Sequence, residues 1–132
     1  MSTDIINHVE FPVAEAEGAR RFYEAALAPL GLTLVISIDP ARTAHGGVRY
    51  GFGKNGYPSM WIHQHSGAEL PIHIAFTADD RPAVDAFHAA ALASGGTDNG
   101  APGIRERYHA NYYAAYVLDP DGNNIEAVCQ RA

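Results

Sequence analysis

Near its C-terminal end the chain carries the stretch Tyr116-Val-Leu-Asp-Pro-Asp-Gly-Asn-Asn-Ile-Glu-Ala-Val128. A polar turn, Asp119-Pro-Asp-Gly122, leads into a short apolar strand that holds one carboxylate, Glu126. A charged side chain inside an apolar strand is costly to bury unless another group pairs with it. We therefore expect the rest of the chain to supply a partner for Glu126.

An internal repeat appears when the chain is compared with itself at an offset of 65 residues. The 24 aligned pairs from position 8 to 31 include eight identities and need no gap. Among the matched pairs are His8 with His73, Phe11 with Phe76, Phe22 with Phe87, and Gly31 with Gly96. The same offset places Glu126 on Trp61, whereas aligning Gly56 with Gly122 shifts the register by one residue and points to Met60.

Each copy of the repeat predicts one strand, one amphipathic helix and three further strands, because apolar residues recur first at a period of two and then at three to four. The expected fold is α+β, a single domain over 1–132 built from two βαβββ modules at about 4–65 and about 70–130. The predicted strands lie at 5–13, 32–38, 45–53, 59–64, 71–77, near 99–101, at 111–118 and at 123–129, and the predicted helices at 14–30 and 80–94. We expect Phe11, Phe22, Phe76 and Phe87 to pack between sheet and helices.

Three polar side chains are predicted to point to the sheet face away from the helices. His8 and His73 alternate with apolar residues on the first strand of each module, and Glu126 alternates with Ile125 and Ala127. On a strand, such alternation points the polar side chains away from the apolar face. Two imidazoles and a carboxylate can hold Fe(II), Mn(II), Zn(II), Co(II) or Ni(II) and leave positions open for a substrate. The pattern predicts one divalent metal ion per chain, with His8, His73 and Glu126 as ligands.

Composition narrows the possible partners. The chain has 47% hydrophobic and 18% charged residues and a formal charge of −6, with Arg and Lys scattered singly, which argues against nucleic acid and against an anionic membrane surface. No apolar run approaches the roughly 18 residues of a membrane span. Cys129 is the only cysteine, so an internal disulfide is impossible and a cytoplasmic location is the expectation.

Several motifs together resemble the vicinal oxygen chelate superfamily, which includes glyoxalase I, extradiol dioxygenases, fosfomycin-resistance enzymes and bleomycin-resistance proteins. The resemblance covers nearly the whole length and implies a cupped mixed sheet, helices on its outer face, a divalent metal held by His8, His73 and Glu126, and a homodimer. The motifs are His8-Val-Glu-Phe11, Phe22-Tyr23, Leu30-Gly31, His73-Ile-Ala-Phe76 and Asp119-Pro-Asp-Gly-Asn-Asn-Ile-Glu126.

The sequence departs from glyoxalase I at one expected ligand. In that enzyme the last strand of the first module supplies a glutamate, but here Trp61 stands at this position, or His63 if the strand is shifted by two. The leading hypothesis is a metal-dependent enzyme acting on a small oxygen-bearing substrate, of lyase or isomerase, dioxygenase or thiol-transferase type. The alternative is a non-catalytic protein of the bleomycin-resistance type that binds and sequesters a small molecule.

Other side chains are candidates for the substrate pocket. Trp61, Tyr116 and one of Tyr112 or Tyr113 offer aromatic walls with polar tips. Arg49 or Arg107 is suited to an anionic substrate group. His109 and Tyr113 are candidate catalytic residues for moving a proton.

Overall fold

The computed structural model describes residues 6–43, 47–65 and 71–132, so the predicted strand positions 5, 45 and 46 lie outside the described residues. Within this range both predicted βαβββ modules are present. Module 1 comprises β1 (Val9–Val13), α1 (Ala16–Leu27), η1 (Ala28–Leu30), β2 (Thr33–Ile38), η2 (Pro40–Arg42), β3 (Arg49–Gly53) and β4 (Met60–Gln64). Module 2 comprises β5 (His73–Thr77), α2 (Arg81–Ala93), β6 (Thr97–Ile104), β7 (Tyr113–Leu118) and β8 (Asn124–Cys129).

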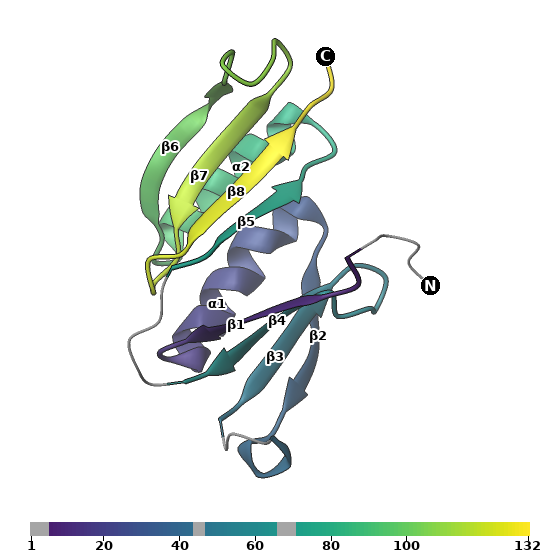
Figure 1. Ribbon diagram of the computed structural model, residues 1–132, viewed down its shortest axis with the longest axis vertical. Helices are drawn as coiled ribbons and strands as arrows, with labels where there is room; N and C mark the ends of the chain where they lie inside the picture. The colour runs from purple at the N-terminus through teal and green to yellow at the C-terminus, as the bar shows by residue number, and fades with distance from the viewer. Residues whose placement is uncertain (1–5, 44–46, 66–70) are drawn as a thin grey trace.

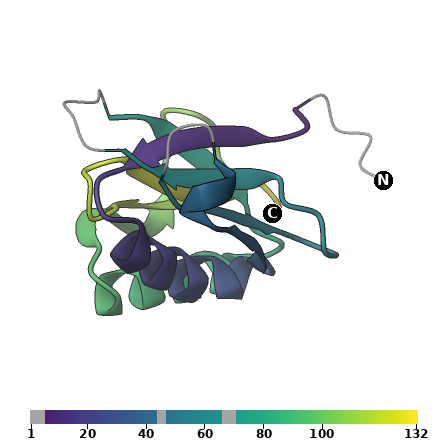
Figure 2. The ribbon, with the colours of Figure 1, turned by 90° about the horizontal axis from the view of Figure 1, so that it is seen from below.

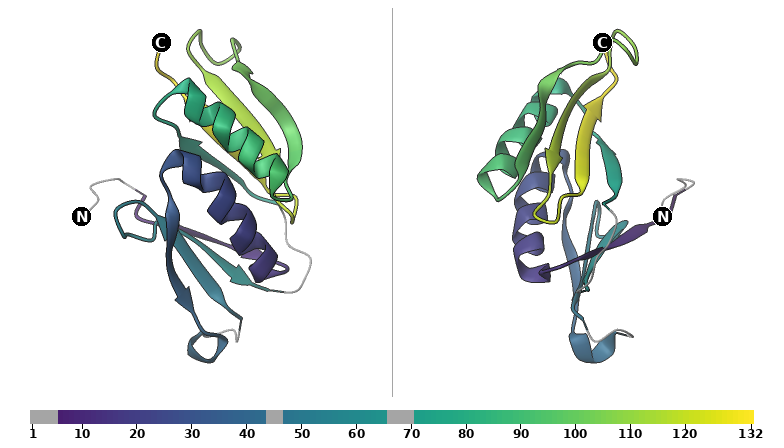
Figure 3. Two further views of the ribbon diagram at one scale, coloured as in Figure 1. Left: turned by 180° about the vertical axis from the view of Figure 1, so that it is seen from behind. Right: turned by 60° about the vertical axis from the view of Figure 1, so that its left-hand side comes forward.

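Each module forms its own four-stranded mixed sheet, in the order β1-β4-β3-β2 and β5-β8-β7-β6. In both sheets the first and last strands of the module pair in parallel, and the other neighbours are antiparallel. The two helices pack side by side on one side of the molecule, and both sheets turn their other faces away from them (Figures 1 and 2). The view from behind in Figure 3 shows the helices as one outer layer. The predicted α+β fold of two modules is confirmed.

The strand registers confirm the internal repeat. Glu10 in β1 pairs with Trp61 in β4, and Ala75 in β5 pairs with Glu126 in β8. Glu10 lies 65 positions before Ala75, and Trp61 lies 65 positions before Glu126, which is the offset of the internal repeat. Trp61 is therefore the counterpart of Glu126, and the alternative register through Met60 does not occur.

Both helices begin at an acidic residue that satisfies free backbone N–H groups. The Glu15 carboxylate accepts from the amides of Glu17 and Gly18, and the Asp80 carboxylate accepts from the amide of Ala83 at 2.9 Å. Such side-chain caps stabilise a helix because the first turn has no internal acceptors for these amides. The α-helical hydrogen bonding of α1 ends at Leu27, earlier than expected, and a 3₁₀ turn containing Pro29 follows.

One hydrophobic core connects the two modules. Phe11, Phe22 and Phe87 are buried, and Phe76 is partly buried against the same cluster, as predicted. Phe22 and the buried Tyr23 stack edge to face with ring centroids 4.9 Å apart. Because helices α1 and α2 both contribute to this cluster, neither module has a separate interior.

The polar turn before β8 fastens module 2 to module 1. The Asp119 carboxylate accepts from the amide of Asn123 at 2.8 Å and from the hydroxyl of Tyr23 on α1 at 2.6 Å. Asp121 accepts from the amide of Ala14 at 2.9 Å. Asp119 is 3% exposed, so its hydrogen bonds replace the water that a buried carboxylate would lose. The Asp-Pro-Asp-Gly motif is thus a structural clamp between the modules.

Several strands are shorter than predicted, among them β3, β5 and β7, and the bounds of β1 and β6 differ for identifiable reasons. β1 begins at Val9, because the amide of Val9 bonds the carbonyl of Ser59 at the start of the partner strand, and residues 6–8 lie before the paired region. β6 is longer than the short strand expected near 99–101, and it runs through Gly100, Pro102 and Gly103. β6 is an edge strand with register shifts, and such strands tolerate proline and glycine. No helix in the described part of the chain is long and apolar enough to cross a membrane.

Candidate metal centre and substrate pocket

Glu126 lies at the centre of the module 2 sheet. It pairs with Ala75 on one side and Tyr116 on the other, and its neighbours in the strand, Ile125 and Ala127, belong to the hydrophobic core. Alternation along β8 therefore turns the Glu126 side chain to the sheet face away from α2. It is only 3% exposed, which makes it a buried carboxylate on the concave side of the sheet.

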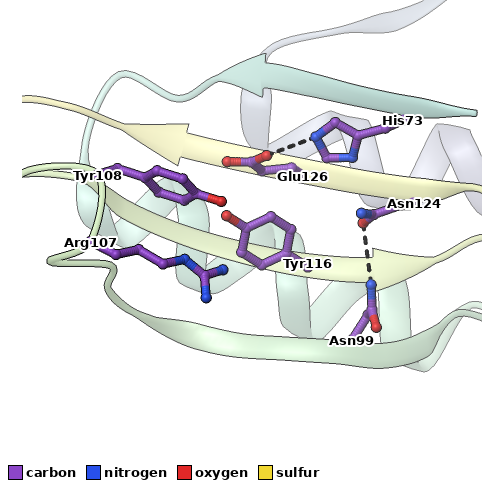
Figure 4. A pocket seen from close by; sticks show the side chains of 7 residues that line it. All are labelled: His73, Asn99, Arg107, Tyr108, Tyr116, Asn124 and Glu126. Atoms are coloured by element: carbon purple, nitrogen blue, oxygen red, sulfur yellow. Dashed lines mark hydrogen bonds and ion pairs between the residues drawn. The ribbon is translucent and has the colours of Figure 1, made fainter.

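Both carboxylate oxygens of Glu126 have close polar neighbours. Oε1 lies 3.0 Å from Nε2 of His73, and Oε2 accepts a hydrogen bond of 2.5 Å from the hydroxyl of Tyr112. The His73 side chain is 48% exposed, in contrast to Glu126. The imidazole therefore stands between the buried carboxylate and the solvent, and the two groups converge as the sequence predicts (Figure 4).

A cavity of about 290 Å³ opens over this pair. Tyr108 and Tyr116 turn their hydroxyl ends toward Glu126, and the Arg107 guanidinium approaches them from the other side (Figure 4). Asn99 and Asn124 line the far wall, where the Asn99 amide donates to Oδ1 of Asn124 at 3.3 Å. The cavity combines one carboxylate, one imidazole, the guanidinium of Arg107 and several neutral hydrogen-bonding groups.

Tyr112 and Tyr116, the two tyrosines next to Glu126, are held in the neutral form. Burial and then the negative charge of Glu126 raise the pKa of Tyr116, and burial together with the hydrogen bond to Glu126 raises the pKa of Tyr112. Ionising either hydroxyl would place a second negative charge beside a buried carboxylate. At neutral pH both groups are therefore hydrogen-bond donors and not bases.

The corresponding face of module 1 is built differently. The Trp61 indole lies against Gly51, where an added Cβ would come within 3.2 Å of the Trp61 ring and 2.8 Å of Pro58. The Arg49 guanidinium stacks on the indole, with Cζ 4.2 Å from the ring centroid. His63, the other candidate for this region, has Nδ1 2.8 Å from the Glu10 carboxylate. Module 1 thus presents an aromatic surface where module 2 presents a carboxylate.

His8 does not join His73 and Glu126 within the chain. It is exposed and lies one residue before β1, not in the middle of a strand, and its Nδ1 is 2.8 Å from Oδ1 of Asn7. Among the residues that the structure describes, no three His, Cys, Asp or Glu side chains gather closely enough to hold a metal ion. The structure therefore brings together two of the three predicted ligands.

The hydrogen bonds of the two predicted proton carriers go to residues other than Glu126. Tyr113 is on the α2 side of β7, where its hydroxyl donates to Asp85 at 2.6 Å. His109 has Nε2 2.9 Å from the amide oxygen of Gln130, and its ring meets the edge of Tyr112 at 5.6 Å. Their role in proton transfer stays a prediction.

Four residues near the site were missed or left open by the sequence analysis. Tyr112 could have been chosen over Tyr113, because it has the same strand parity as Tyr116, which pairs with Glu126. Tyr108 precedes β7 in a turn, where no period in the sequence fixes its direction. Asn99 and Asn124 resemble ordinary surface residues until β6 and β8 are placed.

Comparison with known proteins identifies the family. A family model of the Glyoxalase/Bleomycin resistance protein/Dioxygenase superfamily matches residues 5–127. The chain belongs to this superfamily. A crystal structure of a glyoxalase/bleomycin resistance protein from Albidiferax ferrireducens is 30% identical, with a TM-score of 0.78 over 96% of this chain and 99% of that one. No match was found among curated proteins.

Other superfamily structures share the fold at lower identity. A glyoxalase/bleomycin resistance protein/dioxygenase family enzyme from Burkholderia phytofirmans is 20% identical, with a TM-score of 0.69 over 96% of this chain and 98% of that one. Glyoxalase I from Zea mays is 20% identical, with a TM-score of 0.70 over 94% of this chain and 45% of that longer one. The superfamily includes enzymes with different chemistry, so membership leaves the reaction open.

Proposed function

We propose that this member of the superfamily is a divalent-metal-dependent enzyme that acts on a small molecule with two adjacent oxygen atoms. The observation that carries the proposal is the buried Glu126 carboxylate, whose Oε1 lies 3.0 Å from Nε2 of His73 at the floor of a cavity. Carboxylate and imidazole are the donors that Fe, Mn, Zn, Co and Ni accept.

Arg107 lines the cavity without pairing with Glu126, and the immediate surroundings of this carboxylate fit a cation. In the described part of the chain no arginine or lysine forms an ion pair with Glu126, whose ion-pair partner is His73. A carboxylate that is 3% exposed has lost most of its hydration, and a neutral imidazole offsets only part of that loss. A divalent ion between the two side chains would supply the missing positive charge.

The third ligand has to come from outside this pair. We assign it to His8 of a second copy, in a homodimer in which module 1 of one chain faces module 2 of the other. Two observations support this arrangement: His8 is exposed, and it lies in the module that lacks the carboxylate. The motifs that resemble the superfamily also imply a homodimer.

Residues of the cavity are suited to a reaction in which an oxygen atom becomes negatively charged. A bound metal ion would act as a Lewis acid on the substrate oxygens. Tyr108 and Tyr116 turn their hydroxyls to the same place, where each can donate a hydrogen bond to the developing charge. Isomerisation or lyase chemistry, ring cleavage with oxygen, and thiol transfer all share this requirement, so the cavity supports the class of enzyme and leaves the reaction type open.

A second function, non-catalytic sequestration of a small molecule, is favoured by one observation. Trp61 occupies the position equivalent to Glu126, and its indole is packed between Gly51, Pro58 and Arg49. A binding protein without metal could use this aromatic surface together with the tyrosines of module 2 to enclose a flat ligand.

Metal analysis tests the proposal directly. Protein purified without a chelating tag and incubated with Mn(II), Fe(II), Ni(II) or Zn(II) should retain about one ion per chain by mass spectrometry of the metal content. His73→Ala should remove the ion. His88→Ala, the same change on α2 beside Asp98, should retain it. Absence of metal from the unmodified chain with all four ions would contradict the enzyme hypothesis and favour sequestration.

Mixing variants tests the shared site. His8→Ala and His73→Ala should each lose the metal in a homodimer. In a mixed dimer, one site combines the intact His8 of one chain with the intact His73 and Glu126 of the other. About one ion per mixed dimer should therefore return after the chains are refolded together. If no ion returns, the three residues do not form a site between two copies.

A further inference from the structure

Module 1 carries a second cluster of polar side chains on its concave face, which we call the Arg49 cluster and which consists of Glu10, Arg49, His63 and Trp61. Arg49 donates to the Glu10 carboxylate through Nε at 3.1 Å and through Nη2 at 2.7 Å. The other contacts are His63 Nδ1 to Glu10 at 2.8 Å and the stack of Arg49 on Trp61. The guanidinium is thus fixed on two sides before any ligand arrives.

The fold does not require this cluster. The residues of module 2 that correspond to Glu10, Arg49 and His63 are Ala75, Ala114 and Val128, at the same register positions. Module 2 therefore builds the same sheet with small apolar side chains at all three places. An ion-pair network on a half-exposed surface contributes little to stability, so its presence in one module only points to a binding role.

A cavity of about 250 Å³ lies beside the cluster. Arg42 from η2 and Gln64 at the end of β4 line it together with Glu10, Arg49 and His63. The wall near Gly47 is closely packed, since a Cβ there would fall 2.5 Å from the carbonyl oxygen of Gln64. This position admits only glycine without displacing backbone, so the cavity has a defined edge.

The cavity has a local excess of positive charge in an acidic protein. Two arginines, Arg42 and Arg49, face it with one carboxylate, while the whole chain carries a formal charge of −6. Glu10 is already engaged by Arg49 and His63. Among the described residues no carboxylate forms an ion pair with the second guanidinium, that of Arg42, and a small anion would balance its charge. Guanidinium groups match carboxylate and phosphate oxygens in charge and geometry.

We propose that the cavity bounded by Arg42 and the Arg49 cluster binds the carboxylate or phosphate group of a small molecule. The extension to substrate class rests on the proposed function. Glu10 follows His8 by two residues, so the cluster lies along β1 from the residue assigned as the third ligand. The substrate is then an anion whose charged group binds Arg42 and Arg49. Its two adjacent oxygen atoms bind the metal ion.

Trp61 provides a specific reporter, because it is the only tryptophan of the chain and contacts Arg49. Metal-free protein is titrated with inorganic phosphate and, separately, with acetate, at an ionic strength held constant with NaCl. A saturable change in Trp61 fluorescence is expected with at least one of the two anions, and the stronger response distinguishes a phosphate from a carboxylate site. Arg42→Gln should weaken binding about tenfold or more.

Two control variants distinguish anion binding in this cavity from binding at the metal centre or elsewhere on the surface. Arg21→Gln makes the same charge change on the exposed face of α1 and should bind like the unmodified protein. His73→Ala should lose the metal yet keep the response to the anion, so that failure of either proposal is seen independently. The anion site would be refuted by a response that is absent, that does not saturate, or that is equal in the Arg42→Gln variant.

Discussion

The strand that holds Glu126 in module 2 and the strand that holds Trp61 in module 1 pair with their neighbours in the same register. Their concave faces nevertheless carry different chemistry. Module 2 offers a buried carboxylate with an imidazole and tyrosines, and module 1 offers an indole with a charged cluster. The repeated βαβββ fold therefore determines where side chains converge. Single differences in sequence between the modules determine what each module can bind.

The common core gives the largest expected effect. Phe22→Ala and Phe87→Ala remove buried aromatic rings at equivalent positions of the two helices, and each should lower the free energy of unfolding by about 3–5 kcal/mol. Urea denaturation followed by circular dichroism should show one transition for both variants, because the core is shared. Leu92→Ala, at a residue that is 38% exposed, is the control. Two separate transitions would show that the modules unfold independently.

The clamp between the modules has no counterpart at the equivalent position of the other helix. Tyr23 donates to buried Asp119, whereas the residue that corresponds to Tyr23 in module 2 is His88, which pairs with Asp98 at the surface. Tyr23→Phe removes one donor from a buried carboxylate and should cost about 1–3 kcal/mol of unfolding free energy. Tyr57→Phe, at a residue that is 43% exposed, should cost much less in the same urea titration.

Glu126 and Trp61 should respond differently when metal binding and folding are measured together. Glu126→Gln keeps the size of the side chain and an acceptor for Tyr112, so the metal-free protein should change in stability by less than about 1 kcal/mol. The same variant should lose its metal ion, because an amide is a much poorer ligand. Trp61→Phe should retain the ion. Strong destabilisation of metal-free Glu126→Gln would mean that the carboxylate serves the fold.

The smallest expected effect is a dependence on pH in module 1. Hydrogen bonds from Arg49 hold the pKa of Glu10 below its ordinary value of 4.5. The pair therefore stabilises the folded chain above pH 4.5, and this contribution is lost as the pH falls through the lowered value in the folded state. Glu10→Gln should reduce the unfolding free energy by about 1 kcal/mol or less at neutral pH and by nothing in acid. Thermal unfolding at neutral and at acid pH measures this difference. If Glu10→Gln lowers the stability equally at both pH values, the ion pair with Arg49 is not the source of the effect.

Much of the fold follows from sequence periodicity, and the reasons for the exceptions are physical. The repeat that aligns Phe22 with Phe87 predicts two modules and the equivalence of the Trp61 and Glu126 positions, because side-chain periods report local structure. It does not predict how two finished sheets sit relative to each other. The direction in which side chains point from their strands predicts that His8 lies beside Glu126. In the structure His8 lies in the other module, outside the cavity.

Local errors in the sequence analysis have a different origin. The strand predicted near 99–101 is too short, because an edge strand has one side free of hydrogen bonds and continues through Pro102 and Gly103. Residue type makes Tyr113 as good a catalytic candidate as Tyr112, although alternation along β7 places Tyr112 and Tyr116 on the face of Glu126. Strand parity, applied strictly, is therefore more informative than residue type.

The hydrogen bonds of Asp119 and Asp121 also determine which hairpin turn can accept an inserted sequence. The equivalent hairpin of module 1, at Asn55-Gly56, has open space around Gly56 just as the module 2 turn has around Gly122, but among the described residues its side chains make no comparable bonds to the other module. An epitope or a fluorescent label inserted there would extend into solvent from an exposed loop tip. The same insertion after Pro120 would separate Asp119, which bonds Tyr23, from Asp121, which bonds Ala14, and would weaken the contact between the two modules. Of the two equivalent hairpin turns, the one in module 1 is therefore the suitable place for a label.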